Sequence, residues 1–347
     1  MPEHGGNLLE AARRYGRAPE QWLDLSTGIN PGAYPVPALP PRVWQQLPQQ
    51  SDGLIDAALE YYGVTGKTMG ALPVAGSQQA IQLLPTLRAP GRVGVLSPSY
   101  NEHAYRWQQA GHMLVALRPD SIEGAIESQL ESLDVLVVVN PNNPTGHRFD
   151  PAQLLEWHRR LQTRGGWLVV DEAFIDCTPE QSLAAYSHLP GLIVLRSIGK
   201  FFGLPGLRGG FVLAEVGLLA ALDKRLGPWT VAGPARFIMQ TALQDKNWQQ
   251  RMREQLPRAG ERLAQLLTEH GLPVGGHSAL FVWLPTVAAY TLHEQLAHHG
   301  IWSRYFDPAA GGPGLRLGLP GEGGEWQRLE IALAEIRPSK LDQVVHA

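Results

Sequence analysis

The sequence predicts an α/β fold in which a mostly parallel sheet is covered by helices on both faces, with a smaller α+β part towards the carboxyl end. Short apolar runs rich in valine, isoleucine and leucine recur between residues 72 and 213, and amphipathic stretches separate several of them. Such alternation is typical of parallel strands joined by crossover helices. With 347 residues, 44% of them hydrophobic, the chain can also bury a large core.

The expected elements of the larger part follow one another along the chain. Strands are expected at 72–74, 92–96, 113–116, 135–140, 167–171, 193–197 and 210–213. Helical stretches are expected at 79–88 and at 151–163, where leucine and tryptophan keep roughly helical spacing. The proline-rich stretch 31–48 is expected to be a linker or a crossing of the surface.

The carboxyl-terminal part mixes helices and short strands. A long helical region is expected from Gly227-Pro228 to about residue 271. A strand at 279–284, a helix from about 291 and short strands near 301 and 315 are expected to follow. We therefore predict three regions: an amino-terminal arm with part of the small domain at 1–48, a large α/β domain at 49–227, and a small α+β domain at 228–347.

Composition excludes several classes of protein. The net charge of −3 is balanced, which argues against nucleic acid or an acidic membrane as a partner. No stretch approaches the ~18 apolar residues of a membrane span, and the first residues lack a basic segment followed by an apolar run, so we expect a cytoplasmic protein. Cys177 is the single cysteine, so neither an intrachain disulfide nor a cysteine-based metal cluster is expected, and we predict no metal site.

Lys200 is the residue that points most directly to chemistry. It is one of five lysines, and it stands between the apolar strand expected at 193–197 and a turn, rich in glycine and proline, that ends at Gly210. Burial there would favour the neutral amine, which is the form that a Schiff-base lysine needs. Ser197 and Arg208 can donate hydrogen bonds to an anion that a glycine-rich backbone lets approach closely.

Two other strand ends carry polar residues that suit the same chemistry. Asp171 ends the buried run 167–171, at the edge of an α/β sheet where ligands bind. A carboxylate in that position can keep a pyridine nitrogen protonated, which makes the ring an electron sink. The run 135–140 leads into a turn, Asn-Pro-Asn-Asn-Pro-Thr-Gly, that contains Asn143.

The order of these motifs resembles that of the fold-type I pyridoxal-phosphate enzymes, the aspartate aminotransferase superfamily. The resemblance implies pyridoxal 5'-phosphate as the cofactor and Lys200 as the residue that links to it covalently. It also implies that Asp171 pairs with the ring nitrogen and that Asn143 donates to the phenolic oxygen. Ser197 and Arg208 would then bind the cofactor phosphate.

The resemblance extends upstream of these motifs. Gly76-Ser77-Gln78 precedes the helical stretch 79–88 and matches the phosphate-binding turn at a helix N-terminus, where free N–H groups favour anions. Tyr100, in Ser-Pro-Ser-Tyr, matches the aromatic residue that stacks on the cofactor ring.

Motifs at the two ends of the chain indicate one family within this superfamily. The amino-terminal part contains His4-Gly-Gly-Asn7 and, later, Asn30 before Pro31, while Arg304 and Arg316 stand twelve residues apart near the other end. These motifs resemble the threonine-phosphate decarboxylases of the cobalamin pathway, close relatives of the histidinol-phosphate aminotransferases. By this resemblance His4 and Arg304 lie at the substrate phosphate, Arg316 binds the α-carboxylate, and Asn30 lines the site. Two arginines in this pattern favour a doubly anionic substrate.

The implied reaction is decarboxylation of L-threonine O-3-phosphate to (R)-1-amino-2-propanol O-2-phosphate, a precursor of the cobalamin nucleotide loop. Two alternatives stay open: an aminotransferase acting on histidinol phosphate, and a non-catalytic module that uses the fold for binding. The bond at Cα that stands perpendicular to the cofactor ring decides between lyase and transferase, and the sequence does not give that angle. The resemblance also implies a homodimer.

Two positions depart from the pattern of many relatives. Phe174 stands where they have a tyrosine, so a phenol that could reach the cofactor oxygen is missing. A Tyr-Pro-Asp segment that reaches the neighbouring subunit's cofactor phosphate is also missing, because residues 47–53 read Leu-Pro-Gln-Gln-Ser-Asp-Gly. Both departures concern cofactor affinity and tuning.

Overall fold

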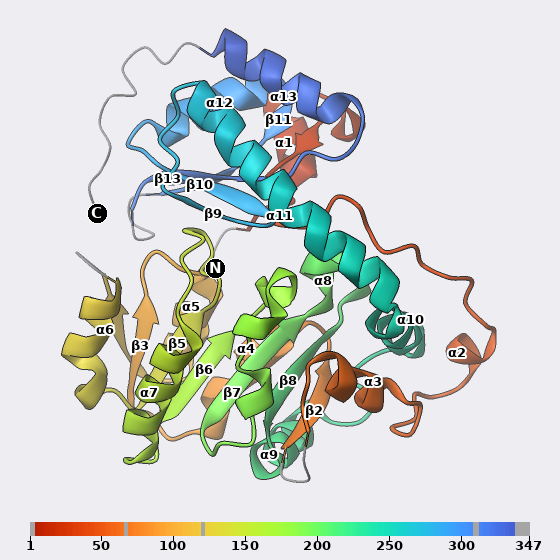
Figure 1. The fold of residues 1–347 in the computed structure, drawn as a ribbon, viewed down its shortest axis with the longest axis vertical. Helices are drawn as coiled ribbons and strands as arrows, with labels where there is room; N and C mark the ends of the chain where they lie inside the picture. The colour runs from red at the N-terminus through yellow and green to blue at the C-terminus, as the bar shows by residue number, and fades with distance from the viewer. Residues whose placement is uncertain (1–3, 66–68, 119–121, 308–311, 337–347) are drawn as a thin grey trace.

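A seven-stranded sheet forms the larger part of the protein, shown in Figure 1. The computed structural model describes residues 4–65, 69–118, 122–307 and 312–336. The order of the strands across the sheet is β2-β8-β7-β6-β5-β3-β4. Strands β3 to β7 pair in parallel, whereas β8 runs antiparallel to both of its neighbours, β2 and β7. Their bounds are β2 Met69–Val74, β3 Arg92–Leu96, β4 Met113–Leu117, β5 Val135–Val139, β6 Trp167–Asp171, β7 Leu192–Ser197 and β8 Gly210–Glu215.

Both faces of this sheet are buried, which explains why its strands read as continuous apolar runs. All five residues of β5 are buried. Val135 and Val137 pack with one hydrophobic cluster, while Leu136 and Val138 pack with another on the opposite face. Because successive side chains alternate between faces, the helices must cover both sides. The predicted mostly parallel, doubly covered sheet is confirmed.

The helices divide between these two faces. Helices α4 (Ser77–Leu83), α5 (Asn101–Gln109) and α9 (Val216–Leu226) place Ile81, Trp107 and Leu219 in one cluster. Helices α3 (Leu54–Tyr61) and α7 (Pro151–Gln162) place Leu54 and Trp157 in the other. The short α2 (Arg42–Gln45) interrupts the proline-rich crossing that the sequence predicted.

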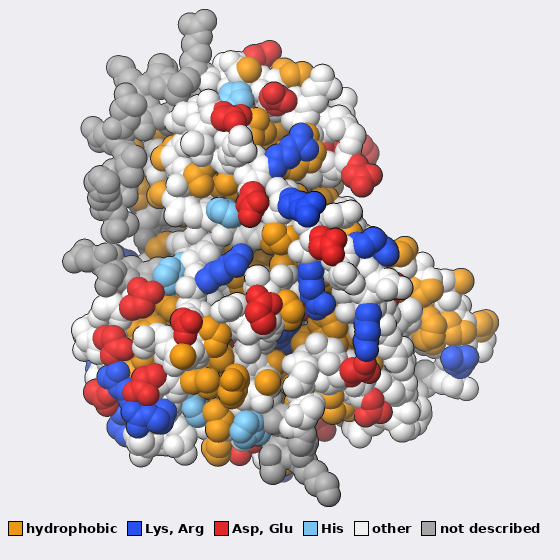
Figure 2. All heavy atoms as spheres, in the orientation of Figure 1, with side chains coloured by type: hydrophobic (Ala, Val, Ile, Leu, Met, Phe, Trp, Pro, Cys, Tyr) orange, Lys and Arg blue, Asp and Glu red, His pale blue; other side chains and the backbone are white. Residues whose placement is uncertain are grey.

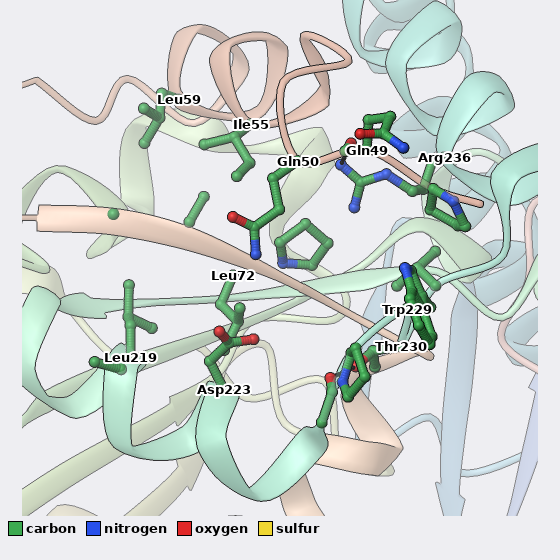
Figure 3. A pocket seen from close by; sticks show the side chains of 18 residues that line it. Gln49, Gln50, Ile55, Leu59, Leu72, Leu219, Asp223, Trp229, Thr230 and Arg236 are labelled. Carbon is green, nitrogen blue, oxygen red and sulfur yellow. Dashed lines mark hydrogen bonds between the residues drawn. The ribbon is translucent and has the colours of Figure 1, made fainter. Parts of the chain in front are cut away.

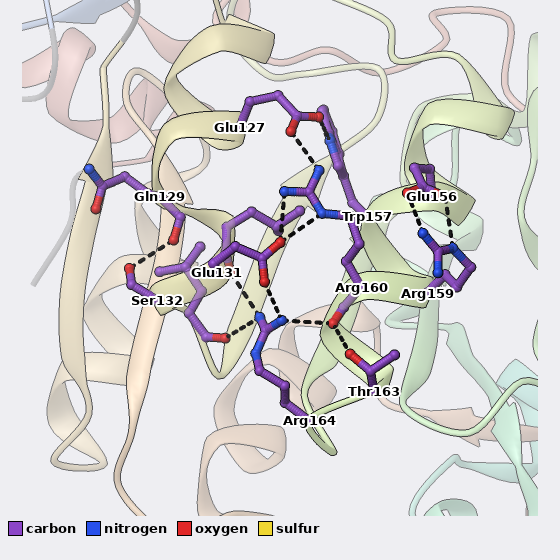
Figure 4. Close-up of polar contacts among 12 residues, drawn as sticks. Glu127, Gln129, Glu131, Ser132, Glu156, Trp157, Arg159, Arg160, Thr163 and Arg164 are labelled. Atoms are coloured by element: carbon purple, nitrogen blue, oxygen red, sulfur yellow. Dashed lines mark hydrogen bonds and ion pairs between the residues drawn. The ribbon is translucent and has the colours of Figure 1, made fainter.

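A polar network joins α7 to α6 (Ile122–Gln129) on the surface (Figure 4). Glu127 accepts hydrogen bonds from Trp157 Nε1 at 2.6 Å and from Arg160 at 2.6 Å. Glu131, just beyond α6, pairs with Arg160 at 2.8 Å and with Arg164 at 2.6 Å. These bonds hold the crossover between β5 and β6 against the helix that precedes β5.

The remaining strands form two small sheets beside the carboxyl ends of the large one. One is antiparallel, in the order β12-β13-β10-β9, and the other is the parallel pair β1-β11. Because β1 pairs with β11, the amino-terminal segment joins the carboxyl-terminal sheets, as Figure 1 shows. The strands are β1 Leu23–Asp24, β9 Gly276–Ser278, β10 Phe281–Pro285, β11 Ile301–Trp302, β12 Arg304–Phe306 and β13 Gly314–Gly318. The domain boundaries at 48 and 227 stay a prediction.

Further helices complete the fold. Helix α10 (Gly233–Gln244) packs against α3 of the larger part, and the others are α1 Leu8–Tyr15, α11 Lys246–Glu269, α12 Ala289–His298 and α13 Gly324–Glu335. The long helical region predicted to follow residue 228 is two helices, because Asp245 breaks it and caps α11 by accepting the Trp248 N–H at 3.0 Å. None of the helices within the described ranges is both long and apolar enough to cross a membrane.

Candidate active site

Lys200 lies in α8 (Ile198–Phe201), directly after β7 ends at Ser197. The helix begins here because Ser197 Oγ accepts the Gly199 N–H at 3.3 Å, as an N-cap serine does. The Lys200 carbonyl accepts the Asn30 N–H at 3.0 Å, which fixes the backbone. Burial, with a smaller contribution from the charge of nearby Arg316, lowers the pKa of the Lys200 amine to about 8, while Asp171 opposes the shift.

Asp171 ends β6 on the same edge of the sheet and is 3% exposed. Its Oδ2 lies 2.9 Å from His103 Nε2, and its Oδ1 accepts the Ala173 N–H at 3.1 Å. The sequence analysis missed His103, although it follows Tyr100 by three residues in a helical stretch and so shares its face. The pairing fixes the orientation of the carboxylate and supplies it with a buried hydrogen-bond partner.

Four of the residues predicted to bind the cofactor phosphate lie together. Ser197 stands opposite Gly210 in the antiparallel pair β7-β8. A Cβ placed on Gly210 would lie 2.8 Å from Ser77 N, and one placed on Gly76 would lie 2.8 Å from Arg208 Nη2. The backbone therefore approaches so closely at Gly210 that only glycine fits there, and at Gly76, beside the Arg208 guanidinium, the φ of 75° favours glycine. Gln78 follows Ser77 in the first turn of α4, and its side-chain amide donates a hydrogen bond to Glu102.

A cavity of about 160 Å³ lies between the large sheet and the small ones. Six of the predicted residues line it: His4, Tyr100, Asn143, Lys200, Arg304 and Arg316. Ser26, Thr27, Ser99 and Phe306 also line it, and the sequence analysis did not single them out. Residues from the amino-terminal arm, the large sheet and the small sheet thus meet at one small cavity.

The two predicted arginines face each other across β12 and β13, because Arg304 and Arg316 are directly opposite in the register. Arg316 is 6% exposed; it donates to Asn143 Oδ1 at 2.5 Å and to the Ser26 carbonyl at 2.7 Å. Burial, with a smaller contribution from the charge of Arg304, lowers the pKa of Arg316 to about 10. Like charges directly opposite each other are unfavourable, so this arrangement favours an anion in the cavity.

Asn30 does not line the cavity. Its side chain is buried, and its amide donates to the Phe201 carbonyl at 2.9 Å while its Oδ1 accepts the Gly32 N–H at 2.8 Å. With the backbone bond to the Lys200 carbonyl, these contacts support the lysine helix from behind. We therefore assign Asn30 to positioning Lys200 as our proposal, in place of contact with substrate.

Phe174 and the segment 47–53, which depart from the pattern of many relatives, each make a contact that the structure shows. Phe174 packs edge-on against Phe281 at 5.0 Å, and its ring centre lies 5.5 Å from Lys200 Nζ, so it forms an apolar wall beside the amine. In the segment 47–53, Asp52 pairs with Arg236 of α10 at 2.6 Å. That segment is therefore fixed to α10.

Comparison with known proteins identifies the same family as the sequence motifs. The family model described as aminotransferase class I and II matches residues 22–332. The chain is 56% identical to a threonine-phosphate decarboxylase of Pseudomonas aeruginosa over 96% of this chain and 97% of the relative. It is 42% identical to a threonine-phosphate decarboxylase of Sinorhizobium sp. over 96% and 98%, respectively. The solved histidinol-phosphate aminotransferase of Sinorhizobium meliloti in complex with pyridoxal-5'-phosphate superposes with a TM-score of 0.82 at 20% identity, covering 96% of this chain and 95% of that one.

Proposed function

The chain belongs to the family of class I and II aminotransferases, with their fold-type I architecture, and we infer that it is a pyridoxal-phosphate-dependent threonine-phosphate decarboxylase. Two curated relatives with that activity match almost the whole chain. The observation in the structure that carries the inference is the cavity that joins Lys200 to the opposed pair Arg304 and Arg316. An amine that forms Schiff bases and two guanidiniums suit a small amino acid with two anionic ends.

The residues present fit pyridoxal phosphate. The close approach of Gly76 and Gly210 to their neighbours leaves a cradle beside Arg208, which supports binding of the cofactor phosphate there. We assign Gly76, Ser77, Gln78, Ser197 and Arg208 to that end. At the ring, we assign Tyr100 to the ring face and Asn143 to the phenolic oxygen. Asp171 is assigned to the ring nitrogen and Lys200 to the covalent link.

The chain's own residues then set which bond breaks. When bound, pyridoxal phosphate supplies a conjugated ring that accepts the electron pair left at Cα as carbon dioxide departs. Arg316 holds the α-carboxylate, and Arg304 with His4 holds the phosphate, so the two ends fix the orientation of Cα. Lys200 Nζ, whose pKa of about 8 lets it hold or release a proton near neutral pH, delivers the proton that replaces the carboxylate at Cα.

The products are carbon dioxide and 1-amino-2-propanol O-2-phosphate, which serves cobalamin nucleotide-loop assembly. Incubation of the purified protein with pyridoxal phosphate and threonine phosphate tests the assignment. Carbon dioxide is expected without any keto-acid acceptor. Dependence on 2-oxoglutarate would instead identify an aminotransferase, and absence of turnover would leave a binding module. A cytoplasmic location stays a prediction.

We also propose that the protein is a homodimer. A groove of about 650 Å³ runs along the edge strand β2, between residues 48–50 and 227–231 (Figure 3). Trp229, on its rim, is 59% exposed and has a left-handed backbone with φ of 58°. Three more exposed apolar side chains lie near α2, where Figure 2 shows apolar atoms gathered on a protrusion: Val36, Trp44 and Leu47. A second copy of this chain is the occupant that the family resemblance supports, and an exposed apolar surface of this kind marks an interface.

A further inference from the structure

A buried carboxylate, Glu102, lies next to the proposed active site, in contact with His4, which lines the cavity. Glu102, in the first turn of α5, is 3% exposed. A negative charge beside a site for two phosphates and a carboxylate opposes substrate binding, and burying it costs free energy unless it is fully paired. A buried Glu102 is therefore expected to have a role that offsets its free-energy cost and its repulsion of the substrate.

Three side chains donate to Glu102 from three parts of the fold. His4 Nε2 of the amino-terminal arm lies 3.0 Å from Oε1. Gln78 Nε2, next to the phosphate cradle, donates to Oε2 at 2.6 Å, and Arg106 Nε of the same helix donates to Oε2 at 3.1 Å. Burial raises the pKa of Glu102, but the hydrogen bonds from Arg106, Gln78 and His4 outweigh burial and leave that pKa below its usual value. The group is thus a carboxylate that is ionised at neutral pH.

The contact to His4 determines what the imidazole can do. Because the Glu102 carboxylate can only accept, Nε2 of His4 is the donor in this contact, and the contact fixes both the tautomer and the place of the ring. Tyr100, whose ring centre lies 6.0 Å from that of His4, and Arg304, which lines the same cavity, are the other polar groups that face His4 from the large and small sheets. Glu10 and Arg14 line the adjoining cavity that His4 shares. Among these groups, Glu102 is the carboxylate in direct contact with His4.

The same carboxylate connects the two anion-binding ends of the site. Gln78 Oε1 accepts the Tyr100 hydroxyl at 3.0 Å, so a continuous chain of hydrogen bonds runs from Tyr100 through Gln78 and Glu102 to His4. The His4 side chain is 48% exposed, and among the described residues its polar contact is with Glu102, which holds it at the cavity. Loss of Glu102 would therefore release the histidine towards solvent.

We propose that Glu102 is a positioning residue for substrate specificity: it holds His4 at the cavity and so keeps the imidazole ring at the place proposed for the substrate phosphate. This role rests on the proposed function, because it assigns His4 to the phosphate end of threonine phosphate. The carboxylate contributes through His4 and makes no contact of its own with the substrate.

A double-mutant cycle tests the proposal on the holoenzyme. Glu102→Gln and His4→Asn should each raise KM for threonine phosphate about tenfold, the usual effect of losing a charged hydrogen bond, with kcat changed by less than about twofold. The double variant Glu102→Gln/His4→Asn should be no worse than His4→Asn alone. If Glu102→Gln raises KM equally in the His4→Asn background, or changes kcat in place of KM, Glu102 acts on the fold or the cofactor and the proposal is wrong.

A second readout does not depend on turnover. Binding of inorganic phosphate to the holoenzyme, measured by calorimetry, should weaken about tenfold in Glu102→Gln and show the same cycle with His4→Asn. Unchanged phosphate affinity would overturn the proposal even if the decarboxylase activity is confirmed. Conversely, a holoenzyme that binds phosphate with this coupling but releases no carbon dioxide would overturn the proposed function alone.

The chain offers a matched control for the substitution. Glu335 pairs with His299 at 3.6 Å at the far end of α13, and its side chain is 63% exposed. Glu335→Gln makes the same chemical change to a carboxylate paired with histidine away from the cavity. It should leave KM, kcat and phosphate affinity unchanged, which separates loss of the Glu102 contact from a general effect of neutralising such a pair.

Discussion

At the scale of single residues, the position of Lys200 sets the protonation of the amine. Burial and neighbouring arginines lower its pKa from 10.5 to about 8. The folded chain therefore binds this proton more weakly than the unfolded chain does. By linkage, the amine opposes folding at neutral pH, and that opposition fades as pH rises from about 8 towards 10.5.

Covalent capture of pyridoxal phosphate by the chain without cofactor tests this shift. The neutral amine is the reactive form, so the rate of capture, trapped with borohydride, should rise from pH 7 and level off above pH 9. An unshifted lysine would instead show a rate still rising at pH 10. Lys200→Ala should trap no cofactor, and trapping in that variant would mean that another lysine carries the link.

The two arginines can be told apart by a ligand that lacks a carboxylate. If Arg304 holds the phosphate and Arg316 the α-carboxylate, Arg304→Gln should weaken inhibition by 1-amino-2-propanol O-2-phosphate about tenfold or more. Arg316→Gln should leave that inhibition nearly unchanged while raising KM for threonine phosphate. The reverse pattern would exchange the two roles. Because Arg316 also contacts Asn143, the absorbance of bound cofactor is the control for an indirect effect.

At the scale of elements, the site depends on contact between a turn of the large sheet and a strand of the small one. Gly146, which closes the turn that carries Asn143, has φ of 74°. A Cβ placed on it would lie 2.6 Å from the backbone of His277 in β9. The backbones thus touch directly, and this contact fixes Asn143 opposite Arg316.

Substitution of Gly146 should therefore affect stability and the site together. Gly146→Ala combines an unfavourable backbone with a clash against β9, so the free energy of unfolding in urea should fall by about 2–4 kcal/mol. Gly165→Ala is the control, because Gly165 has φ of 66° but a Cβ there would meet nothing within 4 Å. It should cost only about 1 kcal/mol for the backbone. Equal losses would mean that contact with β9 contributes nothing.

At the scale of the whole molecule, the exposed groove along β2 predicts self-association. The mass in solution, measured by light scattering, should be twice the chain's 38.0 kDa. Trp229→Glu should shift the mass towards that of one chain, because it places a charge on the apolar rim of the groove. Val287→Glu is the control, since Val287 is also exposed but does not line the groove. A wild-type mass of one chain would contradict the dimer.

Much of the fold followed from the sequence because its strands carry a local signal. Seven predicted strands correspond to β2–β8, with bounds that differ by three residues or fewer. Their residues are apolar on both faces, and polar residues directly follow several of them, so the edge that carries Asp171 and Lys200 could be inferred. The break at Asp245 was missed because a capping aspartate in a polar helix differs little from a solvated one.

The sequence by itself determined the family and its cofactor, and it predicted the reactive amine and the anion-binding turn, because these depend on short motifs and their order. The tertiary structure alone decided which side chains meet. His103 reaches Asp171 across 68 positions, His4 reaches Glu102 across 98, and Arg316 reaches Asn143 across 173. No local pattern encodes such contacts, because they arise only when the packing of the two sheets and the amino-terminal arm brings distant segments to one cavity.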